Sequence, residues 1–148
     1  MDTTIPKKTI PCDKLIFIVE DNEVYAKTLQ SFIVERFPNT TEVKIFGIGE
    51  MLLMELLRNP CIVIMDYFLN SKFNEAHNGM EIIEQIKTQK PQTNIIVLSN
   101  QTDSKIVLDA ITLFDCTYVQ KDHEAFNKIE QAITKIFNKQ TVPPAPWN

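Results

Sequence analysis

The sequence predicts an α/β fold in which a parallel sheet carries helices on both faces. Five short segments with the pattern of strands alternate with segments whose apolar residues recur at helical spacing. Such alternation favours a doubly wound sheet whose parallel strands are joined by right-handed crossovers. The chain has 148 residues, of which 44% are hydrophobic, and this suits a single globular domain.

The first half of the chain contributes two strands and two helices to this prediction. Residues 15–19 are continuously apolar, which is typical of a strand buried on both faces of a sheet. Apolar residues then recur at helical spacing over residues 25–33, and that helix is expected to end before Pro38. Residues 42–46 alternate polar and apolar side chains, which favours a strand near the sheet edge. Residues 50–58 are rich in Leu and Met and predict a second helix.

The second half continues the alternation. Its main feature is the apolar run at residues 61–65, which Asp66 ends, so this carboxylate is expected where a buried strand emerges at the carboxyl edge of the sheet. The other expected elements are strands at residues 94–98 and 116–120 and helices around residues 80–86, 106–111 and 126–137.

These elements place the ordered domain at residues 14–138. Residues 1–13 contain two prolines and no periodicity, which predicts a flexible N-terminal extension. Residues 139–148 include a Pro-rich stretch and predict a disordered tail.

The composition argues against several classes of partner. The net charge is −4 and no cluster of Lys or Arg is present, which argues against direct contact with nucleic acid. No apolar run approaches the roughly 20 residues of a membrane span, and the N-terminus lacks the apolar stretch of a secretory signal. The three cysteines are scattered, so reduced core residues fit better than disulfides or a metal site. We therefore expect a cytoplasmic protein without contact to the membrane.

Polar and charged residues stand directly after four of the five expected strands. Glu20 and Asp21 follow the first strand, Asp66 the third, Ser99 the fourth and Lys121 the fifth. Ligands of doubly wound sheets bind outside the carboxyl ends of the strands, so these side chains are expected to share one pocket. Each has a plainer alternative as a turn residue, a helix cap or a solvated lysine.

The residue types suit phosphoryl transfer. Clustered carboxylates without His or Cys favour a hard divalent cation, Mg²⁺ or Mn²⁺. Asp66 is then the expected nucleophile and forms an aspartyl phosphate. Lys121 is expected to neutralise phosphoryl charge, and Ser99 to donate a hydrogen bond.

In these residues the sequence resembles a response-regulator receiver domain of two-component signalling. The resemblance covers residues 14–138 and rests on the residue set above. Asp66 lies 45 residues beyond Asp21, and Lys121 lies 22 residues beyond Ser99, which are intervals typical of the family. The resemblance implies the flavodoxin-like strand order 2-1-3-4-5.

The resemblance also implies roles for the acidic residues. Asp66 would accept a phosphoryl group from a histidine kinase or a histidine phosphotransfer protein. Asp21, Asp66 and the backbone carbonyl of Phe68 would bind Mg²⁺ directly, and Glu20 would act through water.

A switch follows from the same resemblance. Ser99 and Lys121 would contact the phosphoryl group, and Tyr118, at the position of the family's switch aromatic, would turn inward. That movement would remodel the face of helix four, strand five and helix five, to which a downstream effector binds. A stand-alone signalling phosphoacceptor, not an enzyme, is the function implied; the sequence leaves open whether phosphorylation promotes a homodimer.

The sequence departs from the family pattern at several positions. The stretch before Gly79 is longer than usual, with Asn70 in place of a proline, and Asp122 replaces the proline that commonly follows the lysine. Asn100 is larger than the family's residue and is expected to restrict access to Asp66. Phe68 is expected to shield an aspartyl phosphate from water.

Other functions remain as alternatives. An aspartyl-phosphate hydrolase needs a second Asp two residues after the nucleophile, and Phe68 occupies that position. A flavin-binding module would want a Ser/Thr/Gly-rich phosphate loop after the first strand, where Glu20 and Asp21 stand. A receiver that serves as a scaffold without phosphorylation is the remaining alternative, and the sequence names neither kinase nor target.

Overall fold

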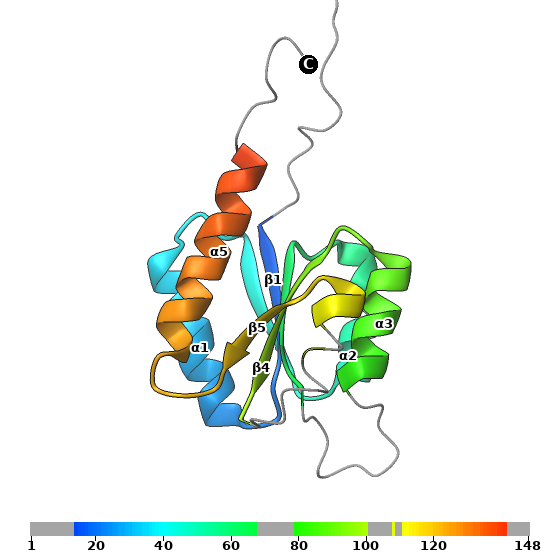
Figure 1. Ribbon diagram of the computed structural model, residues 1–148. Helices are drawn as coiled ribbons and strands as arrows, with labels where there is room; N and C mark the ends of the chain where they lie inside the picture. The colour runs from blue at the N-terminus through cyan, green and yellow to red at the C-terminus, as the bar shows by residue number, and fades with distance from the viewer. Residues whose placement is uncertain (1–13, 68–78, 101–107, 109–110, 142–148) are drawn as a thin grey trace, which may run out of the picture.

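In the computed structural model the chain forms a five-stranded parallel sheet with helices on both faces (Figure 1). The structure describes residues 14–67, 79–100, 108 and 111–141. The strands lie in the order β2-β1-β3-β4-β5, and every neighbouring pair is parallel. The predicted fold class and strand order are therefore confirmed. In chain order the elements are β1 (Leu15–Val19), α1 (Glu23–Arg36), β2 (Glu42–Phe46), α2 (Gly49–Leu53), a 3₁₀ turn η2 (Leu56–Arg58), β3 (Ile62–Asp66), α3 (Gly79–Gln89), β4 (Asn94–Ser99), β5 (Thr117–Gln120) and α5 (Ala125–Thr141).

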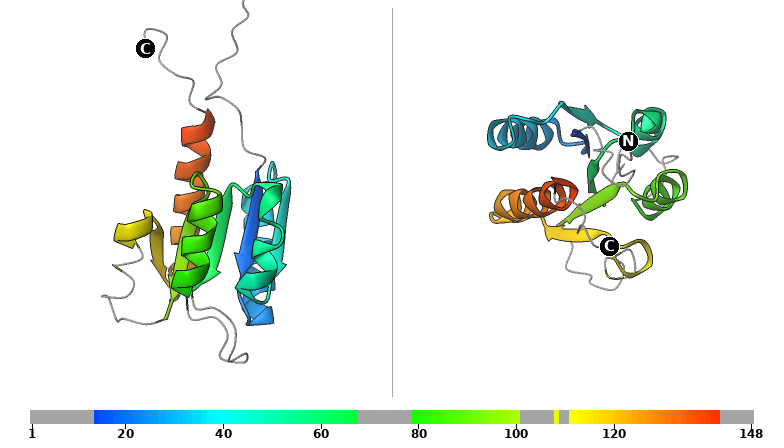
Figure 2. Two further views of the ribbon diagram at one scale, coloured as in Figure 1. Left: turned by 90° about the vertical axis from the view of Figure 1, so that its right-hand side faces the viewer. Right: turned by 90° about the horizontal axis from the view of Figure 1, so that it is seen from above.

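Two hydrophobic layers hold the helices on the sheet. Helices α1 and α5 cover one face, and α2 and α3 cover the other (Figure 2). Side chains of a strand alternate between faces, so Ile62 and Ile64 pack in the layer of α1 and α5, while Val63 and Met65 pack in the layer of α2 and α3. Burial on both sides explains why the central strands are continuously apolar.

The predicted helix at residues 50–58 forms two short pieces instead. After α2, the N–H groups of Glu55 and Asn59 bond to carbonyls three residues back, which is the pattern of a 3₁₀ turn. Glu55 accepts a hydrogen bond from Lys44 of β2 at 2.6 Å, and Leu56 is buried. These tertiary contacts outweigh the helical preference of the segment. Asn59, at φ 59°, ends it.

The last helix is longer than predicted. Helix α5 continues to Thr141, so residues 139–141, which the sequence assigned to a disordered tail, are helical. Pro143 disfavours the α conformation of the residue before it, and the helix ends just short of that residue. Of the predicted helix at 106–111, residues 108 and 111 are helical and the rest lies outside the described residues; residues 112–114 are also helical. Residues 1–13 and 142–148 also lie outside them.

Among the described residues, no helix combines the length and the apolar character needed to cross a bilayer.

Candidate functional site

The register of the sheet brings the carboxyl ends of its central strands to one level. Val19 pairs with Met65, so the next residues along the two strands, Glu20 and Asp66, lie side by side. Ser99 pairs with Gln120, and the following residue is Lys121. The N–H of Lys121 also donates to the carbonyl of Ser99 at 2.9 Å. Backbone pairing alone therefore brings these predicted residues to one edge of the sheet.

Three carboxylates form the acidic part of the site. One oxygen from each of Glu20, Asp21 and Asp66 lies within 4.8 Å of the others. Glu20 is 3% exposed and Asp66 8%, while Asp21 is more open to solvent. Carboxylates this close repel one another unless a cation lies between or beside them. The oxygen donors suit Mg²⁺ or Mn²⁺ in chemical type, and their spacing suits a single ion.

Lys121 supplies positive charge from the other side. Its Nζ donates to Glu20 Oε1 at 2.6 Å and to Asp66 Oδ2 at 3.2 Å, and its side chain is 11% exposed. Ser99 is completely buried at the end of β4. The predicted lysine is therefore part of the site and is not a solvated surface residue.

Asn22 settles one of the alternatives that the sequence left open. Its side chain accepts from the N–H of Tyr25 at 3.0 Å and caps α1. Its own N–H donates to Glu20 Oε2 at 3.0 Å. Because Asn22 is the cap, helix capping does not account for the carboxylate of Asp21.

Burial and charge act together on the ionisable groups. Burial raises the pKa of Glu20; hydrogen bonds from Lys121 and Asn22 oppose the rise, and the charge of Asp66 adds to it. For Lys121, burial favours the neutral amine, but the hydrogen bond to Glu20 and the charge of Asp66 outweigh it, so its pKa is raised overall. Lys121 therefore keeps its charge at neutral pH.

Tyr25 borders the site, although the sequence gave it only a place on the packed face of a helix. The centroid of its ring lies 4.4 Å from Lys121 Nζ, within the range of a cation–π contact. The only signal in the sequence was its position in the first helical turn after the acidic pair.

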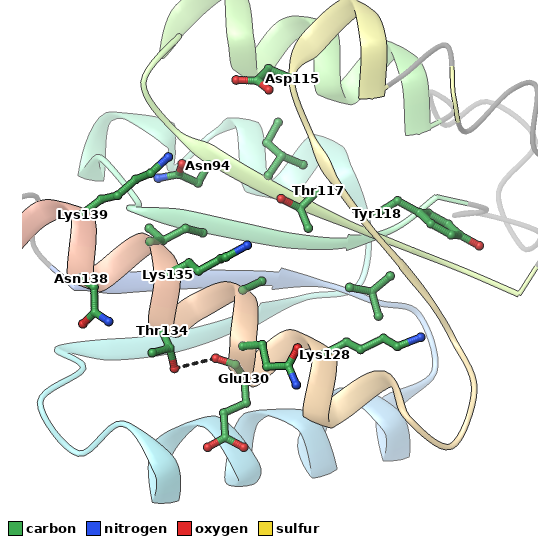
Figure 3. A pocket seen from close by; sticks show the side chains of 15 residues that line it. Asn94, Asp115, Thr117, Tyr118, Lys128, Glu130, Thr134, Lys135, Asn138 and Lys139 are labelled. Carbon is green, nitrogen blue, oxygen red and sulfur yellow. Dashed lines mark hydrogen bonds between the residues drawn. The ribbon is translucent and has the colours of Figure 1, made fainter.

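Three predicted residues remain, namely Tyr118, Asn100 and Phe68. Tyr118 is on β5, the edge strand, where it lines a cavity of about 1180 Å³ between β5 and α5 (Figure 3). Asn100 is exposed, directly after Ser99. Phe68 lies outside the described residues, so its carbonyl and its predicted shielding of Asp66 stay predictions.

Comparison with known proteins adds the family context. The family model described as the response regulator receiver domain matches residues 16–134. The photosynthetic apparatus regulatory protein RegA of Rhodobacter capsulatus is 23% identical over 136 residues, which cover 92% of this chain and 68% of RegA.

Solved structures share the fold. The signal receiver domain of an HD domain-containing protein from Pseudomonas fluorescens gives a TM-score of 0.71 at 21% identity, with 95% of each chain covered. The response regulator TrrA from Thermotoga maritima, solved in complex with Mg²⁺ and BeF, gives a TM-score of 0.67 at 22% identity, covering 82% of this chain and 97% of TrrA.

Proposed function

The chain belongs to the response regulator receiver domain family, and on this premise we propose that Asp66 accepts a phosphoryl group in a two-component system. Receiver domains are signalling phosphoacceptors and not classical enzymes in general, and they interact with kinases or phosphotransfer proteins and with effectors. The observation that carries the proposal is the 3.2 Å contact between Asp66 and Lys121 beside two further carboxylates.

The chemistry is an in-line displacement at phosphorus. An oxygen of Asp66 attacks the phosphohistidine of a kinase or phosphotransfer protein; the new P–O bond forms as the P–N bond breaks. The imidazole nitrogen leaves with the electron pair of that bond and takes a proton from solvent. Lys121 neutralises charge on the phosphoryl oxygens, and Ser99 donates a hydrogen bond to one of them.

The acidic cluster is proposed to hold the divalent cation that this chemistry requires. Asp21 and Asp66 would bind Mg²⁺ or Mn²⁺ directly, with the carbonyl of Phe68 as a further predicted ligand. Both oxygens of Glu20 already accept hydrogen bonds, from Lys121 and from Asn22, which suits its predicted contact through water. When bound, the cation would offset the charge of the carboxylates and of the phosphoryl oxygens.

Tyr118 lies where a change at the site can reach a partner. It is on β5, three residues before Lys121, which directly follows that strand, and the cavity that it lines also borders Lys128 and Lys135 of α5. We place the effector-binding face here, on β5 and α5 together with the helix before β5. The stand-alone arrangement stays a prediction, and a phosphorylation-dependent homodimer stays an open alternative.

Asn100 is proposed to limit access to Asp66. It is exposed and follows Ser99, so replacing it with alanine should open the approach to the acceptor. We expect Asn100→Ala to be phosphorylated about fivefold faster by a small donor such as phosphoramidate, which corresponds to about 1 kcal/mol, the low end of the cost of steric crowding. Asn127→Ala, at an exposed position of α5, is the matched control. Equal rates for Asn100→Ala and wild type would remove this role.

Intact-mass measurement tests the phosphoacceptor directly. Wild type, Asp66→Asn and Asp115→Asn are incubated with Mg²⁺ and phosphoramidate. Asp115 is exposed and has φ 55°, a conformation that asparagine tolerates, so it is a matched control. We expect one phosphoryl adduct on wild type and Asp115→Asn and none on Asp66→Asn. Absence of the adduct on wild type with this donor and with phosphohistidine donors would leave the scaffold alternative.

A further inference from the structure

The ring of Tyr25 is held rigidly at the border of the site. Its backbone N–H bonds to the capping side chain of Asn22 in the first turn of α1. On the other side the ring packs edge-to-face on Phe126 of α5, with centroids 5.6 Å apart and an interplanar angle of 75°. The cap therefore fixes the backbone of Tyr25, and the Phe126 contact from α5 places the ring whose face Lys121 meets.

The ammonium of Lys121 is contacted from three directions. Glu20 Oε1 is at 2.6 Å, Asp66 Oδ2 is at 3.2 Å, and the centroid of the Tyr25 ring is at 4.4 Å. Lysine is a compact charge on a flexible stem, so a single contact would not fix its place. The Nζ of Lys121 lies closer to Glu20 than to Asp66. The two carboxylates by themselves therefore do not hold Lys121 preferentially at the proposed acceptor, Asp66. Because this ammonium is nearly removed from water, its attraction to the ring is stronger than at an exposed site.

We propose, on the basis of the function above, that Tyr25 is a positioning residue for phosphoryl transfer. Its ring face holds the Lys121 ammonium at Asp66, so that the charge is in place when the phosphoryl group arrives. Tyr25 acts through Lys121 and does not itself touch the phosphoryl group. Its buried hydroxyl has no hydrogen-bond partner among the described residues, so the ring, and not the hydroxyl, carries the role.

A double-mutant cycle separates this role from plain packing. Phosphorylation rates with phosphoramidate and Mg²⁺ are measured for Tyr25→Phe and Tyr25→Leu, each in the wild-type and in the Lys121→Met background. We expect Tyr25→Phe to react within about twofold of wild type and Tyr25→Leu to react more slowly by about five- to thirtyfold, the range between an exposed and a desolvated cation–π contact. With Lys121→Met, the leucine variant should lose less than about twofold. Equal losses in both backgrounds would overturn the proposal.

Ring fluorination provides a test that keeps the shape of the side chain. Phenylalanine analogues with increasing fluorination at position 25 withdraw electrons from the ring face and weaken its attraction for a cation. The rate should fall stepwise along this series. Fluorination changes the size and packing of the ring only slightly. A rate that stays constant across the series would therefore contradict a cation–π role.

A nuclear magnetic resonance measurement keeps the proposal independent of phosphorylation. The ring current of residue 25 should shift the ε-methylene protons of Lys121 upfield in wild type and Tyr25→Phe and not in Tyr25→Leu. If wild type shows this shift but accepts no phosphoryl group, the phosphoacceptor function fails while the positioning contact stands. If wild type is phosphorylated but the shift is absent, the contact itself is refuted.

Discussion

Lys121 determines the charge balance at the centre of the site. One ammonium is shared between two buried carboxylates, those of Glu20 and Asp66. A phosphoryl group on Asp66 would add negative charge at the same place, where Lys121 is already within hydrogen-bond distance. If Asp66 accepts a phosphoryl group as proposed, the resting contacts would already hold the lysine near the added charge, without a large rearrangement of its stem.

Sequence reasoning could find the charged residues of the site because each follows a strand. Asp66 and Lys121 interrupt or end apolar runs, and a charge in that position needs a reason. Tyr25 gives no such signal, because an aromatic residue at helical spacing is usually core. Its contact with Lys121 depends on the packing of α1 beside the end of β5, which local pattern does not contain. A helix cap was one alternative for the residues after the first strand, and the bond from the N–H of Tyr25 to the side chain of Asn22 shows which residue is the cap.

The buried thiol of Cys116 leads to a prediction about how stability and thiol reactivity depend on pH. Burial raises its pKa from 9.0 to about 11, with smaller effects from Lys87 and Asp115. Its contribution to the free energy of unfolding is therefore complete below pH 9 and is lost as the pH rises through about 11. In a Cys12→Ser, Cys61→Ala background at pH 8, the folded protein should react with iodoacetamide at least about a hundredfold more slowly than the unfolded chain. Similar rates for the two states would show that the thiol is not buried.

At the scale of elements, the start of α3 is fitted closely to the end of β3. A Cβ added at Gly79 would lie 2.5 Å from the carbonyl oxygen of Tyr67 and 2.9 Å from its ring. Tyr67 follows Asp66 directly, and its N–H donates to the carbonyl of Leu98 at 2.8 Å. The absence of a side chain at Gly79 is therefore what lets this helix approach the backbone beside Asp66.

Replacing Gly79 should disturb both stability and the site. We expect Gly79→Ala to lower the free energy of unfolding by about 1–3 kcal/mol, the usual cost of overpacking, and to slow phosphorylation because the end of β3 must shift. Gly47→Ala is the matched control, since a Cβ there meets nothing within 4 Å. Chemical denaturation with two-state analysis measures the difference. A Gly79→Ala variant as stable as Gly47→Ala would contradict the close fit.

The local sequence pattern predicted most elements well. It was wrong where tertiary contacts determine the limits of an element. The strand at residues 15–19 was predicted with its observed limits because burial on both faces leaves a continuous apolar run. The helix at 50–58 was wrong in its continuity, because the ion pair of Glu55 with Lys44 joins segments that no local pattern connects. The predicted start of the tail, at residue 139, was three residues too early. The first helix-breaking residue in this part of the sequence is Pro143.

At the scale of the whole molecule, strand order turns separate strand ends into one site. β3 lies between β1 and β4, so Glu20, which follows β1, lies at the same edge as Asp66 and Ser99, which end β3 and β4. β2, at the edge, contributes no charged group to the cluster among the described residues. The alternation of strands and helices predicted the parallel sheet but did not by itself say which strands are neighbours. That information came from the resemblance to receiver domains, and the observed pairing confirms it.

The central claim is that Asp66, and no other carboxylate of the cluster, carries the phosphoryl group. It is tested most directly by phosphorylating the wild-type protein, reducing the acyl phosphate with borohydride and mapping the product by peptide mass spectrometry. Reduction converts a phosphorylated aspartate to homoserine, so the modified position is marked covalently. We expect homoserine at position 66 and unmodified residues at positions 20 and 21. Homoserine at position 21, or no reduced residue in protein that carries a phosphoryl adduct, would contradict it.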